Sequence, residues 1–227
     1  MLNNLSVAWR TFAGELVYLY HWLTMRTATW HVEGKANVAE ARANGRPLLF
    51  TFWHGQTPLF IMYGHRFMDP SRFSLVIVGD ERQDVLARLA RRIGATAHAV
   101  DMQGNPVAAG RATLQVIKAL RQGRDSLIAP DGPDGPAYEP KSGVAFLAQK
   151  AEANIMPVGV WTRQAYQRKR WDRYMIPYPF ARIQMVFGRP IPVDKGDDST
   201  ELLAQVTEAL HEARNRAQEL AGITPWR

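Results

Sequence analysis

The side chain best suited to chemistry in this sequence is the imidazole of His54. It follows the apolar run Pro47–Trp53, which is typical of a buried strand, and Gly55 comes directly after it. An imidazole group ordinarily titrates near neutral pH, so a histidine at the end of a strand suits the work of a general base. The alternative is a structural histidine whose ring nitrogens are hydrogen-bonded inside the core. The position of His54 at a strand end favours the role of a general base.

Three aspartates share the setting of His54. Each follows a predicted strand: Asp80 after Ser74–Val78, Asp101 after Thr96–Val100, and Asp131 after Ser126–Pro130. Ligands of an open parallel sheet bind beyond the carboxyl ends of its strands, so these four side chains are expected to converge there. Each aspartate taken alone is more typical of a helix cap or a turn. The set of four predicts a site at one edge of the sheet.

The segment Ile128–Gly143 (IAPDGPDGPAYEPKSG) is a second candidate for function. It is rich in proline and glycine and directly follows a predicted strand. Ordering such a loop is costly, and ordered loops of this kind often carry function. The backbone amides of Asp131, Gly132 and Gly135, together with the ammonium group of Lys141, are expected to cradle an anion. A plain connection between two elements is the alternative.

The composition excludes some kinds of site but does not identify the binding partner. A formal charge of +7 predicts attraction to polyanions such as nucleic acid, anionic lipid or a phosphorylated carrier. The chain has no cysteine, which excludes disulfides, thiolate metal sites and cysteine nucleophiles. No two histidines have the spacing of metal ligands, so the sequence predicts no metal site.

The predicted elements favour an α/β fold with a mainly parallel sheet flanked by helices. Short apolar runs alternate with helical patterns, the strands being expected near 29–32, 47–53, 74–78, 96–100, 126–129, 155–161 and 183–187. The chain has no repeat, low-complexity tract or Gly/Ser linker. We therefore expect an amphipathic helix over residues 1–28 and a single domain over residues 29–227.

The N-terminal segment is apolar and aromatic on one face. Its richest part, Leu16–Met25, contains His21 and is bracketed by charges, and no run reaches the roughly 18 apolar residues of a membrane-spanning helix. Two interpretations stay open. The helix either packs on the core of its own domain or lies in a membrane interface, where tryptophan and tyrosine are favoured.

A third unusual segment, Arg163–Tyr178 (RQAYQRKRWDRYMIPY), interleaves basic and aromatic residues. A solvated basic loop is one interpretation. A surface that faces anionic lipid headgroups is another, because cations and aromatic rings are both favoured there. The same composition is able to stack on and neutralise single-stranded nucleic acid.

The strand-end histidine and the Pro/Gly loop, in this order, resemble two motifs of the lysophospholipid and glycerol-phosphate acyltransferase superfamily. Within it the chain is similar to a small bacterial branch with W-H-G and D-G-P-x-G-P motifs. The resemblance covers residues 29–193 and rests on five segments: Trp30–Gly34, Trp53–Gly55, Ala129–Pro136, Ile155–Val160 and Val186–Ile191. Ala129–Pro136 stands where the wider superfamily has its Glu-Gly-Thr-Arg block.

The resemblance implies an enzyme that transfers an acyl group from coenzyme A or acyl carrier protein to an alcohol or amine of a lipid-like acceptor. No bound cofactor is implied. His54 would deprotonate the acceptor, which attacks the thioester directly without an acyl-enzyme. Amides near Gly132 or Gly135 would stabilise the oxyanion. Further substrate contacts are expected from Gln56, Lys141, Arg82 and Arg111.

The resemblance is incomplete at the residue that orients the histidine. The superfamily pattern is H-x-x-x-x-D, and the position five residues after His54 is Leu59. Another strand end must therefore supply the orienting acid, for which Asp131 and Asp80 are the candidates.

These inferences predict a peripheral enzyme on the cytoplasmic face of the inner membrane, with lipid and the thioester donor as partners and without nucleic acid. Two other classes stay open. One is a hydrolase or transferase of phosphate esters that uses the aspartates with a metal, which a chelator would inactivate. The other is a non-catalytic module that binds anionic lipid or nucleic acid, whose salt-dependent binding would ignore changes at His54 and Asp131.

Overall fold

A computed structural model of the 227-residue chain describes residues 2–78, 83–100 and 106–224. Its centre is a five-stranded sheet in the order β1-β9-β6-β2-β5. The strands are β1 (Thr29–Glu33), β2 (Leu48–Thr51), β5 (Ser126–Ile128), β6 (Asn154–Trp161) and β9 (Arg182–Phe187). All neighbours are parallel except β6 and β9. The α/β fold expected from the sequence, with one mainly parallel sheet flanked by helices, is confirmed.

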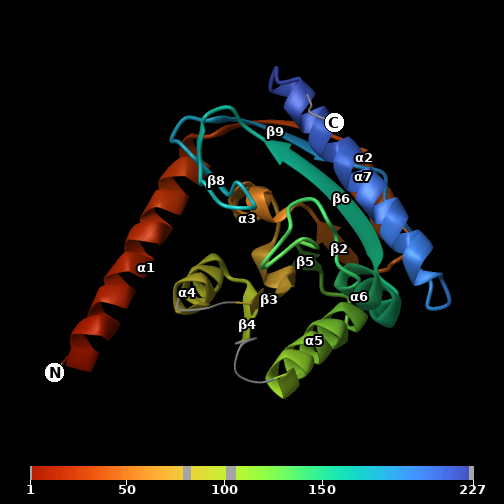
Figure 1. The fold of residues 1–227 in the computed structure, drawn as a ribbon, viewed down its shortest axis with the longest axis horizontal. Helices are drawn as coiled ribbons and strands as arrows, with labels where there is room; N and C mark the ends of the chain where they lie inside the picture. Colours follow the sequence, from red (N-terminus) through yellow and green to blue (C-terminus); the bar gives the residue numbers. More distant parts are fainter. Residues whose placement is uncertain (1, 79–82, 101–105, 225–227) are drawn as a thin grey trace.

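The helices surround this sheet (Figure 1). They are α1 (Leu2–Thr27), α2 (Lys35–Arg42), α3 (Thr57–Phe67), α4 (Gln83–Ile93), α5 (Pro106–Arg121), α6 (Gly143–Ala151) and α7 (Ser199–Leu220). The long helix α7 lies along β6, and Figure 1 shows α1 extending away from the sheet. A Cβ atom at Gly159 of β6 would lie 2.0 Å from the carbonyl oxygen of Ala213, so only glycine allows α7 to approach this closely.

The alternation of side chains along β2 divides the core between the two faces of the sheet. Leu48 and Phe50 point to one face, where Phe50 packs on the rings of Phe60 and Phe187. Leu49 points to the other face and belongs to the cluster under α7. Successive residues of a strand face opposite sides, so an unbroken apolar run such as β2 is expected when both faces are covered.

Two pairs of strands lie outside the central sheet. β3 (Ser74–Val78) and β4 (Thr96–Val100) form a parallel pair that adjoins β5, because the Ser74 amide donates to the Asp125 carbonyl at 2.9 Å. β7 (Ala165–Gln167) and β8 (Met175–Pro177) form an antiparallel hairpin. This hairpin occupies the basic and aromatic segment, for which the sequence predicted no strand.

The N-terminal helix packs on its own domain, as one of the two interpretations of the sequence expected, and it also leaves large apolar side chains exposed. Its second half packs against α3, and the Tyr20 hydroxyl donates to the Pro177 carbonyl at 2.7 Å. Its outer face exposes a row of large apolar side chains: Phe12, Leu16, Val17, Leu19, Trp22 and Leu23. Within the described part of the chain, no helix is long and apolar enough to cross a membrane.

A pair of histidines, the buried His21 and the partly buried His65, joins α1 to α3. His21 Nε2 lies 3.0 Å from His65 Nδ1, and the two rings stack with centroids 5.2 Å apart. Burial lowers the pKa of His21 to about 4, with a smaller contribution from the charge of His65. Burial also lowers the pKa of His65. Protonation therefore opposes the contact between the two helices.

We expect this histidine pair to make the fold sensitive to acid. The pKa of His21 is about 4 in the folded chain and close to its usual value of 6.5 when the chain unfolds. The unfolded chain binds more protons between these values, so stability is complete above pH 6.5 and is lost as the pH falls toward 4. The loss from pH 7 to pH 4.5 should be about 2–3 kcal/mol.

The measurement is urea unfolding at both pH values for wild type and His21→Gln, whose amide keeps a hydrogen bond but does not titrate. The variant should lose about 2 kcal/mol less stability on acidification than wild type. His31→Gln is the matched control because His31 is exposed. An acid response of His21→Gln equal to that of wild type would contradict the prediction.

Candidate active site

The ring of His54 is held by a carboxylate that sequence reasoning did not identify. His54 begins the short 3-10 turn His54–Gln56 at the carboxyl end of β2, and its Nδ1 lies 2.9 Å from Oδ2 of Asp172. The Asp172 side chain is completely buried, whereas that of His54 is 26% exposed. A carboxylate on Nδ1 fixes the tautomer that carries its proton there, which leaves Nε2 as the basic nitrogen.

The turn of the β7–β8 hairpin positions Asp172. Its Oδ1 accepts a hydrogen bond from the Tyr174 amide at 3.3 Å and lies 3.7 Å from Nε of Arg170. The neighbouring rings of Trp171 and Tyr174 flank the imidazole, with centroids 5.3 Å and 5.8 Å away. The hairpin therefore supplies both the acid and the aromatic walls around His54.

The edge of the imidazole beside Nε2 meets the Pro/Gly loop. A Cβ atom at Gly132 would lie only 2.7 Å from Cδ2 of His54, so the loop backbone reaches the ring because this residue has no side chain. Among the described residues, Nε2 has no hydrogen-bond partner. The nitrogen that would act as the base is thus available to a substrate.

Asp131 holds the backbone of His54 and does not bond to its ring. Oδ1 of Asp131 accepts the His54 amide at 2.9 Å, and Oδ2 accepts the Tyr138 amide at 3.3 Å. Burial raises the pKa of Asp131 above its usual value, while these two backbone hydrogen bonds act in the opposite direction. The expected convergence of Asp131 and His54 is present, but the carboxylate on the ring is Asp172.

The two amides expected to bind an oxyanion are already engaged inside the loop. The Gly132 amide donates to the Ala129 carbonyl at 3.2 Å, and the Gly135 amide donates to the Asp131 carbonyl at 3.1 Å. Gly135 has φ of 77° and packs on Trp171, where a Cβ atom would lie 2.7 Å from the ring. These glycines shape the loop against His54 and Trp171, and their amides close its turns.

The other residues that the sequence predicted for the site do not all lie near His54. The exposed Lys141 lies beside the loop, where its Nζ donates to the Gly132 carbonyl at 3.3 Å. Gln56 is buried one turn from His54, and its amide group has no hydrogen-bond partner among the described residues. No hydrogen bond or ion pair joins Arg111, exposed on α5, to the described residues of the site. Asp80, Arg82 and Asp101 lie outside the described residues.

Aromatic packing fixes the loop against α7. The ring of Tyr138 lies 5.4 Å from that of Trp53, and the guanidinium of Arg214 stands 4.4 Å over its face. Arg214 is nearly completely buried, and burial lowers its pKa. Within the described ranges, no three histidine, aspartate or glutamate side chains come together in a way that could hold a metal ion.

A short-range signal for Asp172 is present in the sequence. It is the only acidic residue of Arg163–Tyr178, whose other charged residues are all cations. A second signal is Gly55, whose Cβ atom would lie 2.0 Å from the carbonyl oxygen of Asp172. Glycine after His54 thus admits the backbone of the hairpin. Leu59, at the position of the expected aspartate, is completely buried in the core.

Comparison with known proteins places the fold. No protein-family model matches the sequence. An uncharacterized protein of Rickettsia prowazekii is 28% identical over 174 residues, which cover 74% of this chain and 76% of that protein. The crystal structure of the 1-acyl-sn-glycerophosphate (LPA) acyltransferase PlsC from Thermotoga maritima superposes with a TM-score of 0.56 at 18% identity, covering 96% of this chain and 83% of that one. The fold of this chain therefore resembles that of an acyltransferase.

Proposed function

We propose that this protein transfers a fatty acyl group from a thioester of coenzyme A or acyl carrier protein to a hydroxyl or amine of a lysophospholipid-like or other lipid acceptor. The single observation that carries this proposal is the contact between His54 Nδ1 and the buried carboxylate of Asp172 at 2.9 Å. It makes Nε2 a base on an accessible edge of the sheet. The likeness of the fold to an acyltransferase supports the same reaction.

The proposed reaction uses His54 twice. Nε2 takes the proton of the acceptor hydroxyl as its oxygen bonds to the thioester carbonyl carbon. The carbon–sulfur bond then breaks, and the departing thiolate takes the proton from the imidazolium. Asp172 stabilises the imidazolium between these steps because its carboxylate is completely buried beside Nδ1. The ammonium of Lys141, which donates to the Gly132 carbonyl, is the candidate to stabilise the oxyanion, since the Gly132 and Gly135 amides are engaged.

We further propose that the enzyme works at the cytoplasmic surface of the inner membrane. The exposed row on α1 continues into the segment after β8, where the Phe180 amide donates to Thr27 Oγ1 at 3.1 Å. Phe180 is 71% exposed, and Tyr178 beside it is half exposed. Exposed aromatic and apolar side chains, in a chain with a formal charge of +7, are the composition of a membrane-interface surface.

Mass spectrometry of lipids from cells that express wild type or His54→Ala tests the proposed function. Wild type should deplete a lysolipid or other acceptor and accumulate its acylated product, while His54→Ala at equal abundance should accumulate none. Lys118→Gln, on the exposed face of α5, is the control and should match wild type. Lipid profiles that are the same for wild type, His54→Ala and empty vector would rule out lipid acylation.

A further inference from the structure

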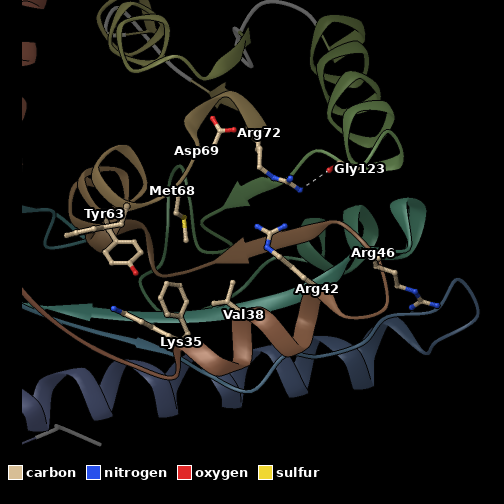
Figure 2. A pocket seen from close by; sticks show the side chains of 12 residues that line it. Lys35, Val38, Arg42, Arg46, Tyr63, Met68, Asp69, Arg72 and Gly123 are labelled. Atoms are coloured by element: carbon tan, nitrogen blue, oxygen red, sulfur yellow. Dashed lines mark hydrogen bonds between the residues drawn. The ribbon is translucent and has the colours of Figure 1, made fainter.

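A second site is indicated at the edge of the sheet opposite His54. A pocket of about 510 Å³ opens there (Figure 2). Arg46, which lines it, precedes β2, and Gly123 precedes β5, whereas His54 follows β2. The pocket therefore lies at the amino ends of β2 and β5, and at the carboxyl ends of β1 and β9, which run in the opposite direction. Its volume is in the range of small-molecule sites.

Two arginines of the pocket share one buried carboxylate. Asp125 is completely buried and accepts both Nη1 and Nη2 of Arg42, at 3.3 Å and 2.6 Å. Nε of Arg72 stands 3.5 Å from the same carboxylate, and the Leu48 amide also donates to it at 3.0 Å. Both guanidinium groups remain partly exposed toward the pocket. One negative charge faces two positive ones, so an anion bound between them would be favoured.

Lys35 adds a cation from the other side of the pocket. It is exposed at the first position of α2, and no ion pair engages it within the described part of the chain. Arg46 adds little net charge because Asp194 accepts its Nη2 at 2.7 Å. Asp69 also lines the pocket; its carboxylate accepts the amide of Ser71, and Figure 2 shows it on the same side as Arg72. The cations outnumber the carboxylates even when Asp69 is counted.

The remaining wall is apolar and aromatic. Tyr63, Phe67 and Met68 line it from the end of α3, and the buried ring of Phe187 packs on that of Tyr63 with centroids 5.6 Å apart. Phe67 is half exposed, and its ring lies 5.0 Å from that of Tyr63. A free inorganic anion would leave this surface in water. A ligand that joins an anionic group to a short apolar or aromatic group would cover it.

We infer that this pocket binds a small organophosphate, with its phosphate between Lys35, Arg42 and Arg72 and its organic group on Phe67. A phosphate monoester is a dianion near neutral pH and has three acceptor oxygens, which matches the surplus of guanidinium and ammonium donors. The pocket is separated from His54 by the length of β2. Its ligand is therefore not the reacting substrate, and the inference holds whether or not His54 is a catalytic base.

Isothermal titration calorimetry with hexyl phosphate, adenosine monophosphate and inorganic phosphate tests this inference. At least one organic phosphate should bind wild type saturably and more tightly than inorganic phosphate. Tighter binding of hexyl phosphate would indicate a lipid-like ligand, and tighter binding of the nucleotide would indicate a nucleotide-like one. Lys35→Gln should weaken binding about fivefold to tenfold, as expected for one charge-assisted contact, and Lys35→Arg should restore it.

Two further variants separate the pocket from general attraction to the basic surface. Lys118→Gln removes an exposed cation that does not line the pocket and should leave the affinity unchanged. Phe67→Ala should weaken the binding of the organic phosphate and not that of inorganic phosphate. Equal affinities of wild type, Lys35→Gln and Lys118→Gln, or no saturable binding of either organic phosphate, would overturn the inference.

Discussion

Replacing His54 with alanine is expected to lower the rate of acyl transfer about a thousandfold, and replacing Asp172 with asparagine should lower it by a similar factor. Alanine removes the base itself. Asparagine keeps the size of Asp172 but cannot stabilise the imidazolium, and its amide nitrogen favours the tautomer with the proton on the wrong ring nitrogen. The two side chains are in contact at 2.9 Å, so they should act as a unit.

The measurement is the rate of thiol release and of acylated product formation by purified protein, for both single variants and the double variant. The double variant should lose little more activity than His54→Ala, because Asp172 has no role without the ring it orients. Asp134→Asn is the matched control, since Asp134 is an exposed acid of the neighbouring loop. A folded Asp172→Asn protein with wild-type turnover would show that the buried carboxylate does not serve catalysis.

Gly55→Ala is expected to disrupt the site because the added methyl group collides with the backbone of the hairpin turn. The added Cβ atom would lie 2.0 Å from the carbonyl oxygen of Asp172, a distance that no packed structure tolerates. The hairpin turn must move away, and the carboxylate moves with it. A displacement of about 1 Å should reduce activity about a hundredfold, and the overpacking should cost about 1–3 kcal/mol of unfolding free energy.

Gly64→Ala is the matched control for this prediction. Gly64 lies in α3, where an added Cβ atom would meet nothing within 4 Å, so alanine should keep full activity and slightly favour the helix. Urea unfolding and the transfer assay are both required, because a purely destabilised protein would recover activity under mild conditions whereas a displaced acid would not. Wild-type activity and stability of Gly55→Ala would contradict the close approach of the hairpin.

The parallel sheet and the place of His54 could be predicted because both depend on local patterns. An apolar run bounded by turn residues predicts a strand, and the geometry of parallel strands then brings His54 and Asp131 to one edge. The hydrogen bond that the His54 amide donates to the Asp131 carboxylate is a direct consequence of that arrangement. The same rule could not say whether the carboxylate would meet the ring or the backbone.

Asp172 could not be placed in the same way because it does not follow a strand of the central sheet. It is 118 residues from His54 and lies in the turn of a short hairpin whose strands have three residues each. Three-residue strands have no periodicity that a sequence pattern can detect. Cations dominate the charge of this segment, and no pattern in the sequence distinguishes its single acid from a solvated one.

The role of the Gly132 and Gly135 amides could not be predicted from the sequence either. A loop rich in proline and glycine predicts tight turns, but a tight turn consumes amides in its own hydrogen bonds. The Gly132 amide reaches Ala129, and the Gly135 amide reaches Asp131. Composition alone does not distinguish an amide that closes a turn from one that faces a ligand.

Because Asp172 lies on the β7–β8 hairpin, the stability of the His54–Asp172 contact differs from the stability of the whole fold. The base stands on a five-stranded sheet with both faces covered, whereas the acid depends on a two-stranded ladder at its margin. Opening such a ladder costs less free energy than unfolding the sheet. On gentle heating the contact between His54 and Asp172 would be lost first, in a state that is still compact, and cooling would restore it.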